Sequence, residues 1–393
     1  MISWREVIAH VATDIENHYD HLKARLNERM GWEDPIHIVP YLGHGTREWL
    51  YLRGRVLEDK GITDPKDDDT IWLNLLNMYK RYSTDEIADA RLRATFGDIS
   101  QEVVTDEEGY FEFKLMLDPK VPLPEGQVWL PIELELLSYP GPQVVSGVKA
   151  TGKVIVPPID AQFGVISDID DTVLQSHVLN LVALARNTFL RNARTRLPFE
   201  GVSAFYQALQ KGTAGTLNPI YYLSSSAWNL YDLLVEFFEV RGIPAGPLFL
   251  VDIGLDKDHL FTPGHLEHKL KHVQMLLDTH PKLPFILIGD SGQKDPEIYL
   301  QAAVENPGRI SAIYIRDVSG EERNKQITGY GDQAREVKTE LIFVKDTLAA
   351  SQHALAHGFI LPETIPAVAE ERAEDKKEPT PVEKLIGGEG TNE

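Results

Sequence analysis

The stretch FGVISDIDDTV at 163–173 predicts a buried strand that ends in clustered carboxylates. Its residues 164–167 suit a strand covered on both faces, and Asp168 and Asp170 follow directly, with Thr172 two residues further on. Open parallel sheets place their ligands beyond the carboxyl ends of their strands. Acids gathered at such an end repel one another, so the stretch indicates a site that holds a cation.

The chain around this stretch alternates short apolar runs with amphipathic segments. The runs are FGVIS at 163–167, PIYYL at 219–223, LFLVD at 248–252, FILIG at 285–289, ISAIYIR at 310–316 and ELIFV at 340–344. Alternation of this kind is typical of a parallel sheet with helices on both faces. We therefore expect an α/β domain over residues 159–360.

The rest of the chain follows different patterns. Residues 34–158 carry short β-like runs between turn residues, which predicts an antiparallel β-sandwich domain with a helical insertion near 68–82. Residues 1–33 have apolar positions at helical spacing and predict an amphipathic helix that packs on a domain or on a protein partner. The acidic segment 361–393 has few large apolar residues, so we expect a disordered tail.

Composition excludes several classes of protein. The chain has 393 residues, enough for more than one domain, and no cysteine, which excludes disulfides and thiolate chemistry. The net charge of -21 opposes nonspecific binding to nucleic acid or to an anionic membrane. We find no signal-peptide pattern after Met1 and no run of about 20 apolar residues that could span a bilayer. We therefore expect a cytoplasmic protein with at most peripheral membrane contact.

Several polar residues of the α/β part follow an apolar run or lie on a predicted helix. Loops that follow parallel strands open on the same edge of a sheet, so these side chains are expected to converge. The chemistry that they support together is phosphoryl transfer. The candidate residues are Asp168, Asp170, Ser224, Lys269, Asp290 and Asp295.

Four of the candidates would act on the substrate. Asp168 would attack phosphorus and carry an aspartyl phosphate, which divides one difficult hydrolysis into two easier steps. Asp170 would protonate the departing alcohol and then take a proton from the attacking water. Ser224 would donate to a phosphoryl oxygen, and Lys269 would neutralise charge on the transferring group.

The acids would also hold a metal ion. Asp168, Asp290 and Asp295 would repel one another and the substrate unless a cation lay among them. Mg²⁺ is a hard ion that binds carboxylate, carbonyl, water and phosphate oxygens, so it suits this set together with Asp170.

Two assignments remain open from the residues alone. Ser225 and Ser226 compete with Ser224 for the phosphate, although they fit better as donors of backbone amides. Lys271 competes with Lys269, because positions two apart on a helix do not share a face.

Four arginines lie downstream of the first acids in a segment without acidic residues, and this segment bears on the substrate. They would bind an anionic lipid headgroup, or they would pair with acids elsewhere as a solvated helix face. We treat them as candidate headgroup contacts. They are Arg186, Arg191, Arg194 and Arg196.

The residues and their order carry a resemblance. DIDDT at 168–172, the strand-end Ser224, a helical lysine and GDSGQKD at 289–295 resemble the four motifs of the haloacid dehalogenase superfamily of phosphatases. More narrowly, SDIDDT, YYLSSSAWNLYDLL, the His268–Lys269 pair and LIGDSGQKDPEIY resemble the actin-patch phosphatidate phosphatase family. The likeness covers about residues 159–360. Ala227 departs from it, where relatives tend to carry proline.

The resemblance implies a Rossmann-like α/β domain and magnesium-dependent hydrolysis of phosphatidate to diacylglycerol and phosphate. It makes Asp168 the nucleophile and Asp170 the acid/base. It favours Ser224 and Lys269 as phosphate ligands, and it assigns Asp290 and Asp295 to the metal. Two alternatives stay open. The substrate could be a soluble phosphomonoester, or the sandwich domain could be the main module of a partner-binding protein.

Overall fold

The computed structural model describes residues 36–58, 86–118, 120, 123–124, 126–141, 147–169, 201–251 and 264–375. The helices predicted at 1–33 and near 68–82 lie outside these residues, as do the end of the chain from 376 and the acid/base candidate Asp170. The domain boundaries therefore stay predictions. Also outside the described residues are the four candidate headgroup contacts, Arg186, Arg191, Arg194 and Arg196.

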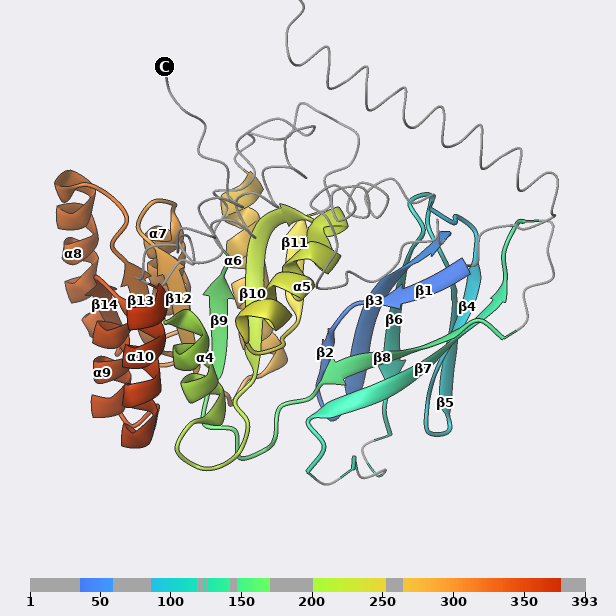
Figure 1. Cartoon of the computed structure of the whole chain (residues 1–393), viewed down its shortest axis with the longest axis horizontal. Coiled ribbons are helices and arrows are strands. Elements are labelled where there is room, and N and C mark those ends of the chain that lie inside the picture. The colour runs from blue at the N-terminus through green and yellow to red at the C-terminus, as the bar shows by residue number, and fades with distance from the viewer. Residues whose placement is uncertain are drawn as a thin grey trace, which may run out of the picture.

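The second half of the chain builds a six-stranded sheet whose paired strands all run parallel (Figure 1). In space the order is β11-β10-β9-β12-β13-β14. The bounds are β9 Gly164–Asp168, β10 Ile220–Ala227, β11 Leu248–Val251, β12 Phe285–Asp290, β13 Ile310–Arg316 and β14 Glu340–Val344. Every residue of β9 and β12 is buried, as expected for strands covered on both faces. The predicted parallel sheet is confirmed.

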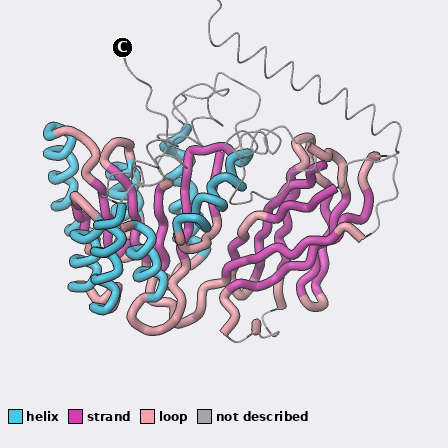
Figure 2. Tube along the Cα trace, in the orientation of Figure 1, coloured by secondary structure: helices cyan, strands magenta, loops and turns pink. Residues whose placement is uncertain are grey.

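Helices cover both faces of this parallel sheet (Figure 2). Side chains of α4, α5, α9 and α10 join one buried cluster with the sheet, and side chains of α6, α7 and α8 join the other. Among the described helices, none combines the length and apolarity that crossing a bilayer requires. The bounds are α4 Val202–Lys211, η2 Trp228–Leu230, α5 Tyr231–Arg241, α6 Gly264–Thr279, α7 Asp295–Glu305, α8 Glu321–Glu336, α9 Thr347–Ala356, η4 Pro362–Thr364 and α10 Ile365–Asp375.

The prediction of a disordered tail from residue 361 is wrong as far as residue 375. Here the chain forms η4 and α10, and α10 packs against α4 and α9. Val368 is fully buried, and Glu371 Oε2 accepts a hydrogen bond from the Ala204 amide at 2.6 Å. The few apolar residues of the segment lie where α10 packs on the domain. The prediction failed because it was based on the acidic composition of the whole segment and not on the position of these residues.

The first half of the chain forms an eight-stranded sheet with its own core. Its path is β1-β3-β2-β8-β7-β4-β5, and β6 pairs with β3. The strands are β1 Ile36–Pro40, β2 Gly43–Gly45, β3 Trp49–Glu58, β4 Arg91–Phe96, β5 Ile99–Val104, β6 Tyr110–Met116, β7 Trp129–Ser138 and β8 Lys149–Ile155. Its named strand pairs are antiparallel except β2–β8, so the sheet is mixed where a purely antiparallel domain was expected. Nothing in the short GHG run of β2 signals this parallel pair.

Aromatic rings join the mixed sheet to the parallel sheet. The ring of Tyr41 stacks on that of Tyr231 with centroids 4.0 Å apart, and on that of Trp228 at 5.2 Å. The Leu42 amide also donates to Tyr231 Oη at 2.7 Å. Because η2 and Tyr231 directly follow β10, this contact helps to position the end of that strand.

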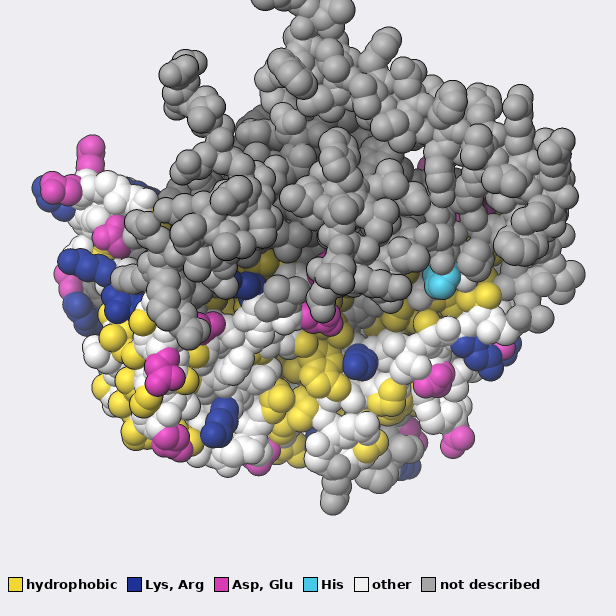
Figure 3. Space-filling model, viewed as in Figure 1, with side chains coloured by type: hydrophobic (Ala, Val, Ile, Leu, Met, Phe, Trp, Pro, Cys, Tyr) yellow, Lys and Arg dark blue, Asp and Glu magenta, His cyan; other side chains and the backbone are white. Residues whose placement is uncertain are grey.

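Charge is dispersed over the visible described surface. On the face shown in Figure 3, acidic and basic side chains of the described residues are interspersed, with apolar side chains between them. The net charge of -21 is therefore not gathered into a single acidic patch on the described part of this face.

Candidate active site

Three carboxylates meet at the carboxyl ends of two neighbouring strands. Asp168 ends β9, Asp290 ends β12, and Asp295 begins α7. One carboxylate oxygen of each lies within 4.8 Å of the others, and all three residues are buried. Since β9 and β12 pair in parallel, the sheet brings their ends to the same edge, as the sequence predicts.

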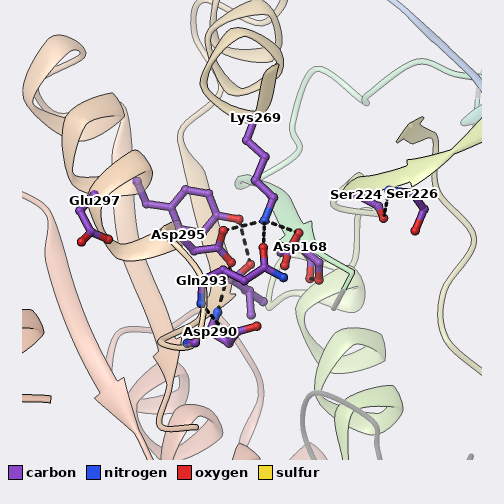
Figure 4. Close-up of polar contacts among 12 residues, drawn as sticks. Asp168, Ser224, Ser226, Lys269, Asp290, Gln293, Asp295 and Glu297 are labelled. Carbon is purple, nitrogen blue, oxygen red and sulfur yellow. Dashed lines mark hydrogen bonds and ion pairs between the residues drawn. The ribbon is translucent and has the colours of Figure 1, made fainter. Parts of the chain in front are cut away.

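Lys269 lies between two of these acids (Figure 4). Its Nζ is 2.7 Å from Asp168 Oδ1 and 2.7 Å from Asp295 Oδ1, and it donates a hydrogen bond to Gln293 Oε1 at 3.1 Å. The side chain reaches the cluster from α6 and is buried, whereas Lys271 is exposed. The structure thus places Lys269, and not Lys271, among the acids.

Burial and neighbouring charge perturb the ionisable groups of this cluster. Burial, followed by the charges of Asp295 and Asp290, raises the pKa of Asp168 well above its usual value, although the Lys269 ammonium opposes this. Burial would lower the pKa of Lys269, but Asp168 and Asp295 outweigh it and raise that pKa. With three carboxylates facing one ammonium, ionised acids leave surplus negative charge.

The GDSGQKD turn at 289–295 holds two of the acids in place. Asp290 Oδ1 accepts hydrogen bonds from the amides of Gly292 at 2.7 Å and Gln293 at 3.1 Å. Asp295 Oδ2 accepts one from the Asp290 amide at 3.2 Å. A Cβ on Gly289 would lie 2.4 Å from Asp295 Oδ2, so only glycine lets Asp295 approach this closely.

Arg323 supports the turn from α8, a role that the sequence analysis did not identify. Its Nη2 donates to the Gln293 carbonyl at 2.9 Å and to Glu297 Oε2 at 2.7 Å, and its Nε donates to the Ser291 carbonyl at 3.3 Å. Nothing local in the sequence connects α8 with this turn. Gln293 was also missed as a partner of Lys269, although it lies within the quoted GDSGQKD motif.

The serines lie on the adjacent strand. Leu223 of β10 is in register with Asp168, so Ser224 comes one residue beyond that pair. Ser224 and Ser226 are buried, and the Ser226 amide donates to Ser224 Oγ at 3.0 Å. Figure 4 draws both serines apart from the acids, and among the described residues no hydrogen bond links them to Asp168.

The acid cluster fits a hard divalent cation. Asp168 Oδ2 is buried and has no hydrogen-bond partner among the described residues. The three clustered side chains offer only carboxylate oxygens, which are the ligands that Mg²⁺ takes in proteins. A buried oxygen without a partner and a surplus of negative charge are both features that a bound cation would satisfy.

Known proteins match the part of the chain that carries this cluster. Residues 163–317 match the family model described as the catalytic domain of phosphatidate phosphatase APP1. The phosphatidate phosphatase APP1 of Saccharomyces cerevisiae is 31% identical over 154 residues, which are 39% of this chain and 25% of the yeast protein. An uncharacterized protein of Schizosaccharomyces pombe is 28% identical over 247 residues, 61% of this chain and 38% of that protein.

The solved structures give only slight likenesses. A carbohydrate acetylesterase from Xanthomonas citri aligns with a TM-score of 0.26 and 8% identity, over 77% of this chain and 75% of that chain. A likeness of this size carries no argument about function. The chain spans 25% and 38% of the length of these two relatives. Residues 163–317 therefore resemble the catalytic domain of phosphatidate phosphatase APP1, and the match of this chain to the Saccharomyces cerevisiae protein agrees with that likeness.

Proposed function

We propose that this chain is a magnesium-dependent phosphatase that hydrolyses phosphatidate to diacylglycerol and phosphate through an aspartyl phosphate. The observation that carries the proposal is the buried cluster of Asp168, Asp290, Asp295 and Lys269 within the segment that matches the family model. In this proposal the parallel sheet and its helices are a Rossmann-like haloacid dehalogenase domain, and the mixed sheet is the β-sandwich domain beside it.

Asp168 is the nucleophile of the proposed reaction. It ends β9 at the carboxyl edge of the sheet, beside the other acids of the cluster, and one of its carboxylate oxygens attacks phosphorus. Attack forms an oxygen–phosphorus bond and breaks the bond between phosphorus and the glycerol oxygen. Asp170, two residues further along the chain, protonates the departing alcohol and then takes a proton from the water that hydrolyses the aspartyl phosphate.

The remaining residues bind charge. Asp168, Asp290 and Asp295 would hold Mg²⁺ together with Asp170, and the ion would offset the negative charge of the acids and of the substrate phosphate. Lys269 contacts Asp168, so its ammonium lies close to the place that a phosphoryl group bonded to Asp168 would take. There the ammonium would neutralise negative charge on that group.

Ser224 is the proposed donor to the phosphoryl oxygens from the neighbouring strand. Its place one residue beyond the register partner of Asp168 puts it at the same edge of the sheet. Its hydroxyl oxygen accepts a hydrogen bond from the Ser226 amide, which leaves its own proton to donate.

The substrate is the part of the proposal that rests most on the relatives. The Saccharomyces cerevisiae protein is named a phosphatidate phosphatase, which favours a phospholipid substrate. Peripheral contact with a membrane that contains this lipid, and a cytoplasmic location, are proposed with it. The four arginines between 186 and 196 are the proposed headgroup contacts, and residues 1–33 are the proposed site of a protein partner.

A substrate profile tests this function. The purified full chain is assayed with Mg²⁺ and with a chelator, against phosphatidate in detergent micelles and against a panel of soluble phosphomonoesters. We expect phosphate release from phosphatidate that requires Mg²⁺ and is lost in the Asp168→Asn variant. We expect Asp170→Asn to slow turnover by about 10²–10⁴-fold.

Each component of the proposal has its own contrary result. Normal magnesium-dependent turnover by Asp168→Asn would refute the nucleophile. Preference for soluble esters would refute the phospholipid substrate and leave the phosphatase in place. Absence of turnover on every ester would favour the partner-binding alternative.

A further inference from the structure

A second group of metal-binding side chains lies outside the acid cluster, where α9 meets β14. Glu340 opens β14, His353 lies on α9, and His357 is the C-cap residue that directly follows α9. One ligand atom of each lies within 4.8 Å of the other two. We propose that these three residues bind a divalent transition-metal ion such as Zn²⁺ and that the ion fastens the edge strand β14 to α9.

The spacing on α9 aims both imidazoles at one carboxylate. His353 and His357 are four residues apart, so they share a face of the helix, and their ring centroids are 4.0 Å apart. Nε2 of His353 lies 2.8 Å from Glu340 Oε2, and Nε2 of His357 lies 3.0 Å from Glu340 Oε1. Both rings therefore present the same nitrogen to the same acidic group.

The other nitrogen of each ring already has a partner. Nδ1 of His357 lies 2.9 Å from the His353 carbonyl oxygen, which can only accept, so this nitrogen carries the proton. Nδ1 of His353 lies 3.0 Å from Oη of the buried Tyr314. Histidines that bind metals characteristically pair their second ring nitrogen in this way, which fixes the orientation of the ring.

The proton on Nδ1 of His357 has a consequence at Nε2. A neutral His357 directs the lone pair of Nε2 toward the carboxylate of Glu340, and two acceptors at 3.0 Å repel each other. A cation between them turns both groups into ligands. The rival arrangement is a second proton on His357, which would make a plain ion pair, and binding of a metal distinguishes the two.

The donor set selects the kind of metal. Two imidazole nitrogens and one carboxylate suit Zn²⁺, Ni²⁺ or Cu²⁺, whereas the acid cluster offers only oxygen and suits Mg²⁺. A tetrahedral Zn²⁺ with bonds of about 2.0–2.1 Å needs ligand atoms about 3.3 Å apart, slightly more than the present contacts. The Glu340 side chain is 49% exposed, so it has room to rotate, and water can take the fourth position.

Metal titration of the full chain tests the site. Millimolar Mg²⁺ is present throughout to occupy the acid cluster, and Zn²⁺ binding is followed by calorimetry. We expect one equivalent to bind, and we expect His353→Gln and His357→Gln to weaken binding by at least about tenfold. His37→Gln, which removes an exposed histidine on β1, is the matched control and is expected to bind as the unchanged chain does.

Two further readouts do not depend on catalysis. Co²⁺ bound to these ligands should give a visible absorption band that is lost in His357→Gln, and Zn²⁺ should raise the melting temperature of the unchanged chain but not of that variant. Equal Zn²⁺ binding in all four proteins, or no binding at micromolar Zn²⁺, would overturn the proposal. Both results are independent of whether the chain hydrolyses phosphatidate.

Discussion

Replacing Lys269 by methionine should strongly destabilise the α/β half when no divalent cation is present. The ammonium contacts Asp168 and Asp295 at 2.7 Å each, and the residue is only 4% exposed. Methionine keeps much of the side-chain volume but leaves three buried carboxylates without their cation. Breaking a buried ion pair by removing one partner costs about 3–5 kcal/mol.

Urea unfolding measures this loss. With a slope of about 3 kcal/mol per molar urea, a cost of 3–5 kcal/mol lowers the midpoint by about 1–1.7 M. Lys271→Met is the matched control, because it changes the same residue type on the same helix at an exposed position. We expect the free energy of unfolding of the control to lie within about 0.5 kcal/mol of that of the unchanged chain.

Added Mg²⁺ gives the experiment a second arm. If the acids bind the ion, Mg²⁺ should restore part of the stability that Lys269→Met loses, because the ion replaces the missing positive charge. Equal midpoints for the two lysine variants in chelator would refute the electrostatic argument. A loss in Lys269→Met that Mg²⁺ does not change would refute the cation site but not the ion pair.

Three other perturbations test different parts of the molecule. Gly289→Ala should lower the affinity for Mg²⁺ and destabilise the fold by about 1–3 kcal/mol, because the added Cβ would lie 2.4 Å from Asp295 Oδ2. Titration calorimetry measures the affinity and urea unfolding measures the stability. A variant with unchanged affinity and stability would contradict the packing argument. Tyr41→Ala should lower the free energy of unfolding by about 3–5 kcal/mol, by analogy with other buried aromatic residues. Because the Tyr41 ring stacks on Tyr231, the variant should also speed proteolysis of the α/β half, and equal proteolysis rates would contradict this. Burial, reinforced by the nearby His280 and His272, lowers the pKa of His44 to about 3, so between that value and the usual value of about 6.5 only the unfolded chain takes up the proton. Stability should therefore fall as the pH drops below about 6.5, by up to about 1.4 kcal/mol per pH unit, and His44→Phe should remove this part of the slope; parallel pH profiles for the two proteins would contradict the assignment.

The sequence predicts the parallel sheet and much of its candidate site because both follow from local patterns. Strands buried on both faces need continuous apolar runs, and FILIG at 285–289 is such a run. The carboxyl ends of parallel strands meet at one edge, so the sequence predicts that Asp168 and Asp290 converge, and in the structure they do.

Other features depend on contacts that no local pattern carries. The GHG strand β2 has no apolar signal, and its parallel pairing with β8 arises from residues about a hundred positions away. Arg323 reaches the 289–295 turn from another helix, and Glu340 meets His353 and His357 only because β14 and α9 pack together. The packed helix α10 was missed because its acidic composition outweighed a few apolar residues.

The order of the parallel sheet bears on how the catalytic segment can be isolated. The segment that matches the family model ends at residue 317, just after β13, whereas β14 covers the outer edge of β13. A fragment cut at 317 would expose a buried apolar strand with unpaired amides and carbonyls, which is a template for aggregation. Expression of the recognised segment alone should therefore give insoluble protein, and a fragment intended for crystallisation should extend through α10.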